Sequence, residues 1–289
     1  MQYHRASFAL IILVFIGSLS FDTVAENPAD ASFWYDIPQK DLVYLQTAHG
    51  QVVIALTDSI APQHVARFKN LVQTGFYNNR YFYRVVEGFV AQAGANNTHR
   101  KNASTSPLPA EFTANDVEGF YEVERPAPFA PVAGFINGFP AGTTPDRQRY
   151  WLTHCPGMVA MARDNKKDTA TTDFFVVMGQ APRHLDRNMS VFGRVVAGMD
   201  TLQKLPRGNL ENNGMINDFE ENSELIFANL GSELPVAKRR QFKVQLPGHS
   251  AYQKKVAQGR LLNNAFFVDD ALAPRPIDIC YYMTEVREY

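Results

Sequence analysis

The sequence lacks the features that mark several functional classes. Its 289 residues carry a formal net charge of −1, so no basic excess favours nucleic acid or an anionic membrane surface as a partner. Its seven histidines show no spacing typical of a metal site, and it contains no phosphate loop or nucleophile elbow. No internal repeat is evident. We therefore expect neither a bound metal ion nor a cofactor.

Cysteine is also scarce. Cys155 precedes a strand-like apolar segment, and Cys280 lies in a second predicted strand, at residues 277–286. In an exported protein such an even pair favours a disulfide between the two. Two buried free thiols are the alternative, because two cysteines form a weaker pattern than a full disulfide framework.

No apolar run is long enough to cross a bilayer, which takes about 20 residues in a helix. The run at residues 8–16 follows Arg5 and precedes a small residue, Ala25, so residues 1–25 are predicted to be a signal peptide. An uncleaved membrane anchor is the alternative. No cysteine follows the run, which excludes a bacterial lipoprotein anchor. We expect export to a bacterial periplasm, and no stable membrane association once the signal is cleaved.

The remaining chain has the composition of a globular protein, with 45% hydrophobic and 20% charged residues. Residues 43–47 and 51–56 are predicted to form a hairpin. Pro62 then begins a helix, at a position where proline is tolerated. His64 lies opposite the apolar stripe of this helix, so it is expected to be a solvated surface residue.

Two short apolar runs joined by a tight turn follow at residues 82–94. Alternation predicts Phe82 and Arg84 on one face of the first strand and Tyr83 on the other, and Gly88 permits the turn. Arginine carries five hydrogen-bond donors in a rigid fork. Beside an apolar floor, such a group is suited to bind a carbonyl or an amide. The alternative is an ordinary strand pair from which Arg84 reaches into solvent.

This segment resembles the signature strand pair of cyclophilins, the peptidyl-prolyl cis-trans isomerases. Six fixed positions of the family motif are filled, by Phe82, Arg84, Gly88, Phe89, Gln92 and Gly94. Blocks at residues 157–176 and 185–195 follow in the family's order and spacing. The resemblance covers residues 40–234. It implies a mainly β fold, a closed antiparallel eight-stranded barrel with capping helices.

Two segments exceed the usual family domain. Residues 95–156 form a long proline-rich insertion, which also contains aromatic residues and is therefore expected to pack. Residues 235–289 form a C-terminal extension, which is too short for a confident independent domain. We expect the extension to pack on the barrel.

The resemblance implies a peptidyl-prolyl cis-trans isomerase that accelerates X-Pro isomerisation during the folding of exported proteins. Its partners would be proline-containing polypeptides, and we expect a monomer. Arg84 and Gln92 are the implied catalytic residues. The implied substrate-binding residues are Phe89, Val90, Ala162, Asp173, Phe175, His184, Leu185 and Met189.

Three of these positions depart from the family pattern. Asp173 replaces the usual glutamine, His184 stands where many members have tryptophan, and Met189 stands where histidine is common. An Asp173 carboxylate within reach of Arg84 would either hold the guanidinium away from the prolyl amide or fix it in the right pose. We favour the first, because a neutral amide competes poorly with a carboxylate for the same donors, and we therefore expect Asp173→Gln to raise kcat/KM. The alternative is that Asp173 points to water and the change has no effect. The alternative function is a catalytically weak cyclophilin-like binding module or chaperone. Its contact surface would be the insertion and the extension.

Overall fold

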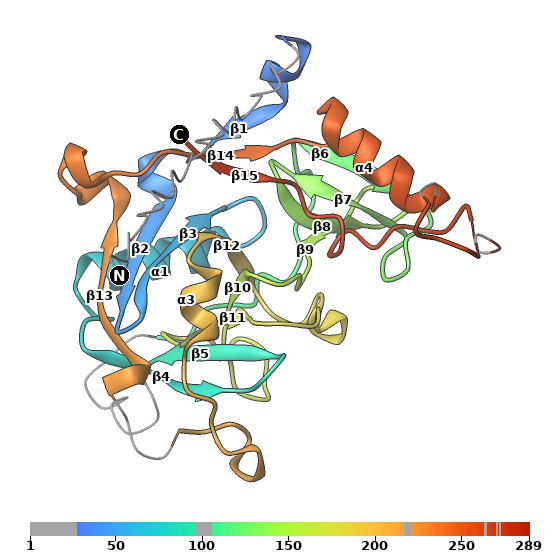
Figure 1. Cartoon of the computed structure of the whole chain (residues 1–289). Helices are drawn as coiled ribbons and strands as arrows, with labels where there is room; N and C mark the ends of the chain where they lie inside the picture. Colours follow the sequence, from blue (N-terminus) through green and yellow to red (C-terminus); the bar gives the residue numbers. More distant parts are fainter. Residues whose placement is uncertain (1–27, 96–105, 217–220, 263–264, 270, 272) are drawn as a thin grey trace, which may run out of the picture.

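A computed structural model describes residues 28–95, 106–216, 221–262, 265–269, 271 and 273–289 (Figure 1). The predicted signal peptide, residues 1–25, lies outside these ranges. Within them, no helix is both long and apolar enough to span a membrane.

Eight strands close into a barrel in which every neighbouring pair is antiparallel (Figure 1). This confirms the predicted fold class. Closure leaves the barrel without an exposed edge strand. The strands, in order around the barrel, are β10 (Met158–Met161), β11 (Phe174–Val177), β5 (Val90–Gly94), β4 (Arg80–Val85), β13 (Glu224–Leu230), β2 (Leu42–Thr47), β3 (Gly50–Leu56) and β12 (Val191–Ala197).

The helix α1 (Pro62–Gln73) packs its apolar stripe into the barrel's interior cluster, led by Phe68, which is fully buried. Its N-cap residue, Ala61, has no side chain that can accept from the first turn. Instead the carboxylate of Glu111, from the insertion, accepts the backbone N–H groups of Gln63 and His64, both at 3.1 Å. An acidic group is favourable here because it satisfies free donors at the positive end of the helix.

The prediction that His64 is a solvated surface residue is wrong. Its side chain is fully buried, and its Nδ1 lies 2.7 Å from Glu111 Oε2. His64 lies four residues before Phe68 and seven before Leu71, so it is on the buried side of the helix and not opposite the apolar stripe. The insertion supplies the partner of its ring, Glu111, which a local pattern of hydrophobicity cannot report.

The insertion and the extension each form a small sheet outside the barrel. The insertion makes a four-stranded antiparallel sheet, and the extension contributes two of three strands to another. The segment predicted as a strand at residues 277–286 is instead turn and irregular backbone as far as residue 285, and its strand begins only at Val286. The two sheets are β6 (Phe120–Glu124), β7 (Val132–Ile136), β8 (Phe139–Thr143) and β9 (Tyr150–Leu152), and then β1 (Trp34–Asp36), β14 (Phe242–Gln245) and β15 (Val286–Glu288).

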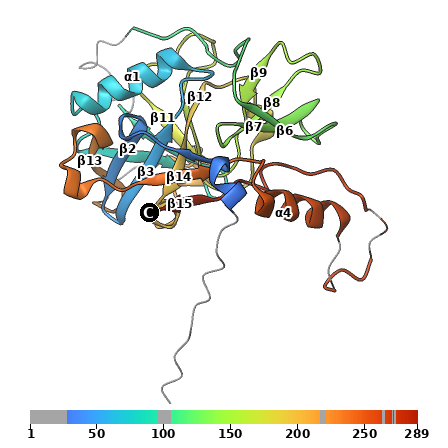
Figure 2. The same cartoon turned by 90° about the horizontal axis from the view of Figure 1, so that it is seen from above.

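Two further α-helices complete the described regular structure, apart from short 3-10 helices. The helix α3 (Met199–Gln203) follows β12, and α4 (Ser250–Leu261) belongs to the extension. Figure 2 shows α1 and α4 on opposite sides of the molecule. The 3-10 helices are η1 (Pro28–Phe33), η2 (Gln39–Asp41), η4 (Arg183–Leu185), η5 (Leu210–Asn212), η6 (Glu221–Ser223), η7 (Gly231–Glu233) and η8 (Val236–Lys238).

Barrel, insertion and extension share one hydrophobic cluster. Phe135 of the insertion and Tyr252 of α4 meet edge to face at 5.8 Å between ring centroids, and both belong to the cluster that contains Phe175 of the barrel. In Figure 1 the β6–β9 sheet and α4 accordingly lie together beside the barrel. Since burial of apolar surface is the main favourable term in folding, neither added segment is a loosely attached appendage.

A buried arginine ties the same three parts together. Arg194 of β12 donates to the carbonyls of Gly138 and Thr284, at 2.9 and 2.7 Å, and to the Thr284 hydroxyl at 3.2 Å. Burial lowers the pKa of Arg194 to about 10, so it remains a cation at neutral pH. Gly138 lies in the insertion and Thr284 in the extension.

Replacing Arg194 by methionine is expected to reduce the free energy of unfolding by about 1–3 kcal/mol, since buried carbonyls lose their donors. Urea denaturation monitored by fluorescence measures the change. Arg147→Met is the matched control, because Arg147 makes a surface ion pair with Glu122, and such pairs contribute about 0–1 kcal/mol. Equal losses in the two variants would contradict the expectation.

Candidate active site

The guanidinium of Arg84 is held in place on the barrel surface by two hydrogen bonds and an aromatic ring. Its Nε donates to the carbonyl oxygen of Asn213 at 2.8 Å, and its Nη1 donates to Gln92 Oε1 at 3.3 Å. Its central carbon lies 5.9 Å from the ring centroid of Phe89. Partial burial lowers the pKa of Arg84, but an arginine remains charged at neutral pH. The predicted catalytic residues Arg84 and Gln92 are therefore in contact.

The backbone around Arg84 departs from the regular alternation that the sequence predicted. Arg84 pairs with Gln92 across β4 and β5, but the register shifts between Phe82 and Arg84. As a result Phe82 and Val85 pack into the same core cluster, while Arg84 stays outside it. The predicted common face for Phe82 and Arg84 is therefore wrong. A β-bulge re-aims the side chains that follow it, which a period-two pattern cannot represent.

A loop after α3 brings the Asn213 carbonyl to Arg84. Along the second half of β4, Val85 N–H donates to the Gly214 carbonyl, and Ile216 N–H donates to the Tyr83 carbonyl, both at 2.9 Å. The loop thus pairs with β4 beyond the point where β13 stops. No role was predicted for this loop, and nothing in its composition signals one.

The predicted proline-pocket residues gather beside Arg84. Val90 and Phe175 are buried members of one hydrophobic cluster, and the other apolar residues of the predicted set pack against it. The exposed imidazole of His184 stacks on the Phe89 ring, at 6.4 Å between centroids. The residues packed against the cluster are Phe89, Ala162, Leu185 and Met189. An apolar floor therefore adjoins a fixed cationic donor.

Asp173 lies beneath this surface rather than on it. It is only 5% exposed, and its Oδ1 accepts a hydrogen bond from the Tyr83 hydroxyl at 3.2 Å. Its backbone passes so close to Gly94 that a Cβ there would come within 2.6 Å of the Asp173 Cα. This close approach, together with a φ of +143°, explains why the motif ends in glycine.

The expected inhibitory pair between Asp173 and Arg84 is not formed. In the part of the chain that the structure describes, the guanidinium hydrogen bonds go to Asn213 and Gln92, and no ion pair joins it to Asp173. Among the described residues, hydrogen bonds link Asp173 to Arg84 through Tyr83 and Gln92. The reason given for a gain of activity in Asp173→Gln therefore does not hold.

A buried histidine, His154, packs behind Phe175 of the apolar floor. His154 is fully buried, stacks on Phe175 at 6.1 Å between centroids, and lies with Nδ1 2.9 Å from Asp186 Oδ1. Asp186 also accepts from Arg183 at 2.7 Å. Burial alone would raise the pKa of Asp186, but the hydrogen bond from His154 and the charge of Arg183 bring the pKa below its ordinary value. Asp186 lies in the block at residues 185–195 that resembles the family, whereas no feature of the sequence indicated a role for His154.

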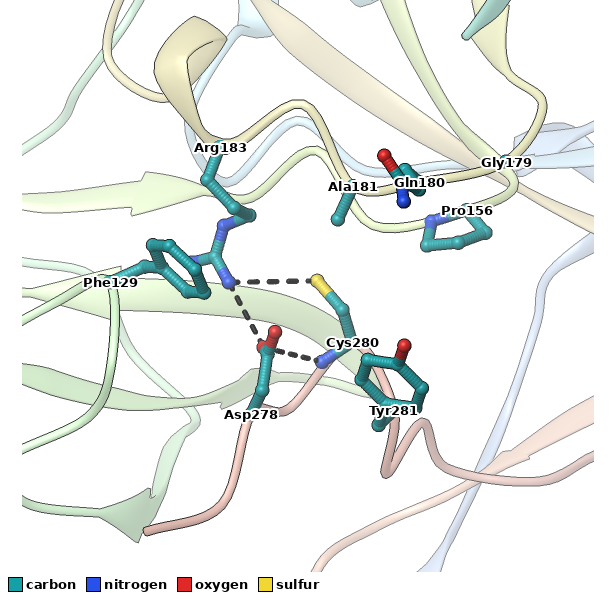
Figure 3. Close-up of a pocket in the computed structure, with 9 residues that line it drawn as sticks. All are labelled: Phe129, Pro156, Gly179, Gln180, Ala181, Arg183, Asp278, Cys280 and Tyr281. Carbon is teal, nitrogen blue, oxygen red and sulfur yellow. Dashed lines mark hydrogen bonds and ion pairs between the residues drawn. The ribbon is translucent and has the colours of Figure 1, made fainter. Parts of the chain in front are cut away.

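The Sγ atoms of Cys155 and Cys280 are joined in a disulfide, which links the end of the insertion to the extension. Beside it lies a cavity of about 570 Å³ (Figure 3). The cavity has walls from all three parts of the chain, including Phe129, Arg183 and Tyr281. Arg183 donates to Asp278 at 3.0 Å, and its guanidinium lies 4.9 Å from the Phe129 ring centroid. Arg183, the one cation among the described residues that line this cavity, is therefore already paired.

The described residues contain no group of three or more His, Cys, Asp or Glu side chains that could hold a metal ion. The chemistry available at Arg84 is thus that of a charged hydrogen-bond donor beside an apolar surface. Such a site can stabilise a change of charge distribution in a bound amide.

Residues 42–221 match the family model for cyclophilin-type peptidyl-prolyl cis-trans isomerases. Peptidyl-prolyl cis-trans isomerase A of Dickeya dadantii (strain 3937) is 30% identical over 176 residues, which cover 60% of this chain and 74% of that protein. Peptidyl-prolyl cis-trans isomerase B of Escherichia coli (strain K12) is 28% identical over 192 residues, which cover 64% of this chain and 96% of the relative.

The crystal structure of cyclophilin AquaCyp293 from Hirschia baltica is similar over 90% of this chain and 95% of its own, with a TM-score of 0.69 and 25% identity. Since the family model stops at residue 221, this likeness also takes in parts of the chain outside the family domain.

Proposed function

The chain belongs to the cyclophilin-type peptidyl-prolyl cis-trans isomerases, and on this basis we propose that it isomerises X-Pro bonds in exported polypeptides. The isomerase activity itself follows from membership and from relatives that carry that name. The observation that carries the assignment to a site is the Arg84 guanidinium, held at an apolar floor by Asn213 and Gln92.

The reaction requires no covalent chemistry. Rotation about an amide crosses a barrier of about 18–20 kcal/mol, because resonance stiffens the C–N bond. In the twisted state the prolyl nitrogen loses that resonance and becomes a hydrogen-bond acceptor. A donor that contacts the nitrogen only in this state lowers the barrier, since it binds the transition state better than either ground state.

The geometry at Arg84 meets this requirement. Two of its nitrogens are engaged by Asn213 and Gln92, whereas among the described residues its Nη2 donates to no acceptor. Nη2 therefore keeps its N–H groups for the substrate. Phe89 and the cluster around Phe175 offer an apolar surface for the proline ring, and they exclude water that would weaken the donor.

The exported role rests on residues 1–25, whose charged start, apolar run and small terminal residue are typical of a cleaved signal. We expect expression in a bacterium to place a monomer that begins at Glu26 in the periplasm. Cell fractionation, N-terminal sequencing and light scattering test this. Uncleaved protein in the cytoplasm or the membrane fraction would contradict export, and a stable dimer would contradict the monomer.

Polypeptide binding apart from isomerisation is a second candidate function, favoured by the cavity between insertion, barrel and extension (Figure 3). Exposed aromatic rings at its rim, Phe129 and Tyr281, can contact apolar side chains. Suppression of the aggregation of a proline-free unfolded polypeptide would support this function, provided that Phe129→Ala abolishes it. Aggregation unaffected by the wild-type protein would contradict it.

A further inference from the structure

Four side chains at the active site form one continuous run of hydrogen bonds. Arg84 Nη1 donates to Gln92 Oε1 at 3.3 Å, Gln92 Nε2 donates to Tyr83 Oη at 2.6 Å, and the Tyr83 hydroxyl donates to Asp173 Oδ1 at 3.2 Å. The run crosses three neighbouring barrel strands, from β4 and β5 to the residue just before β11. It starts at the catalytic cation and ends at a carboxylate.

The chemistry of the groups sets the direction of every bond in this run. A guanidinium has only donors, so Gln92 must turn its oxygen towards Arg84 and its NH₂ group towards Tyr83. The Tyr83 oxygen accepts from that NH₂ group, and its single proton is then donated to an acceptor-only carboxylate. A carboxylate at the far end therefore favours the one amide orientation that supports Arg84.

Packing keeps the far end of the run away from substrate. Asp173 is 5% exposed and Tyr83 is 8% exposed. Asp173 lies in close contact with Gly94. Its second carboxylate oxygen accepts a hydrogen bond from the Thr172 hydroxyl at 3.2 Å. Buried polar groups that are bonded at both ends are well suited to hold one arrangement of their neighbours.

We propose that Tyr83 and Asp173 are positioning residues for isomerisation, which act on Arg84 through the side-chain amide of Gln92. This inference rests on the isomerase function proposed above. It assigns Asp173 a role in support of catalysis, in place of a substrate contact or an inhibitory pair. It also gives Tyr83, which the family motif leaves variable, a defined function in this chain.

Loss of the run has a specific kinetic consequence. Without the Tyr83 hydroxyl, the Gln92 amide loses the acceptor for its NH₂ group and is free to rotate, so Arg84 loses a fixed partner part of the time. The apolar floor, which contributes to ground-state binding, is unchanged. Turnover is therefore affected more than affinity, as expected for a contact that matters chiefly in the transition state.

The test compares Tyr83→Phe, Asp173→Asn and the double variant. We expect Tyr83→Phe to lower kcat/KM for a prolyl tetrapeptide by between about twofold and tenfold, the equivalent of one net hydrogen bond. The dissociation constant of the same peptide, measured by NMR titration, should change by less than about twofold. Because both changes break the same run, the double variant should be no less active than Tyr83→Phe.

Tyr77→Phe is the matched control, since the Tyr77 hydroxyl is equally buried and donates at 2.7 Å to the carbonyl of Thr172, beside Asp173. It should lower the melting temperature while kcat/KM stays at the wild-type value. If Tyr83→Phe is too unstable to assay, Asp173→Asn still decides. Asparagine can donate to the Tyr83 oxygen as well as accept from it, so the direction of the hydrogen bonds is no longer fixed and kcat/KM should fall about twofold or more.

Three results would overturn the proposal: wild-type kcat/KM in folded Tyr83→Phe, additive losses in the double variant, or a higher kcat/KM in Asp173→Asn. The last would restore the inhibitory interpretation of Asp173. An inactive wild-type protein would have a different meaning, because it would refute the isomerase function and the positioning proposal along with it.

Discussion

Replacing Arg84 by alanine is expected to lower kcat/KM for a prolyl peptide by about 10²–10³, the usual effect of removing one preorganised donor from a site that stabilises charge. Arg84 lies outside the core cluster that contains its strand neighbours Phe82 and Val85, so the barrel should remain folded. Isomerisation assays on the purified protein, together with circular dichroism, measure both properties.

Arg80→Ala is the matched control for this variant. Arg80 lies at the other end of β4, where its Nε donates to the Phe76 carbonyl and its guanidinium packs on the Phe76 ring at 4.8 Å. Its loss should leave kcat/KM unchanged. Arg84→Lys should remain nearly as inactive as Arg84→Ala, because an ammonium group cannot bond Asn213 and Gln92 while also offering a planar donor to substrate. Full turnover in a folded Arg84→Ala protein would remove Arg84 from the mechanism.

Loss of the Cys155–Cys280 disulfide is expected to reduce the free energy of unfolding by about 2–5 kcal/mol. The bond joins positions 125 residues apart, and in the chain-entropy description a long closed loop restricts the unfolded chain strongly. The loss should appear in Cys280→Ser and equally in the wild-type protein treated with dithiothreitol. Urea denaturation measures it in both.

Dithiothreitol provides an internal control, because it should have no effect on Cys280→Ser. Alkylation of the untreated, denatured wild-type protein should modify neither cysteine, and intact mass detects this directly. Two modified thiols would show that the bond is absent in the purified protein. An unchanged unfolding transition after complete reduction would show that the shared hydrophobic cluster alone holds the extension in place.

The sequence by itself was sufficient to predict those parts of the site whose residues lie close together in the chain. Arg84 and Gln92 lie on two strands joined by a turn at Gly88, and a short turn sets the register of the strands that flank it. The spacing of the motif therefore already brought the catalytic donor and its amide partner together. The closed barrel around them was implied by the resemblance of residues 40–234 to the cyclophilins.

Only the tertiary structure decided the surroundings of these residues. The bulge between Phe82 and Arg84 depends on how β4 pairs with its neighbours, and it directs the Tyr83 hydroxyl to Gln92 and Asp173. His64 is buried, and the partner of its ring, Glu111, comes from the insertion. Spacing and alternation report which side chains share a face of one element. Burial, hydrogen-bond partners and charge pairing depend on which distant segments lie against that face, and packing of the whole chain determines this.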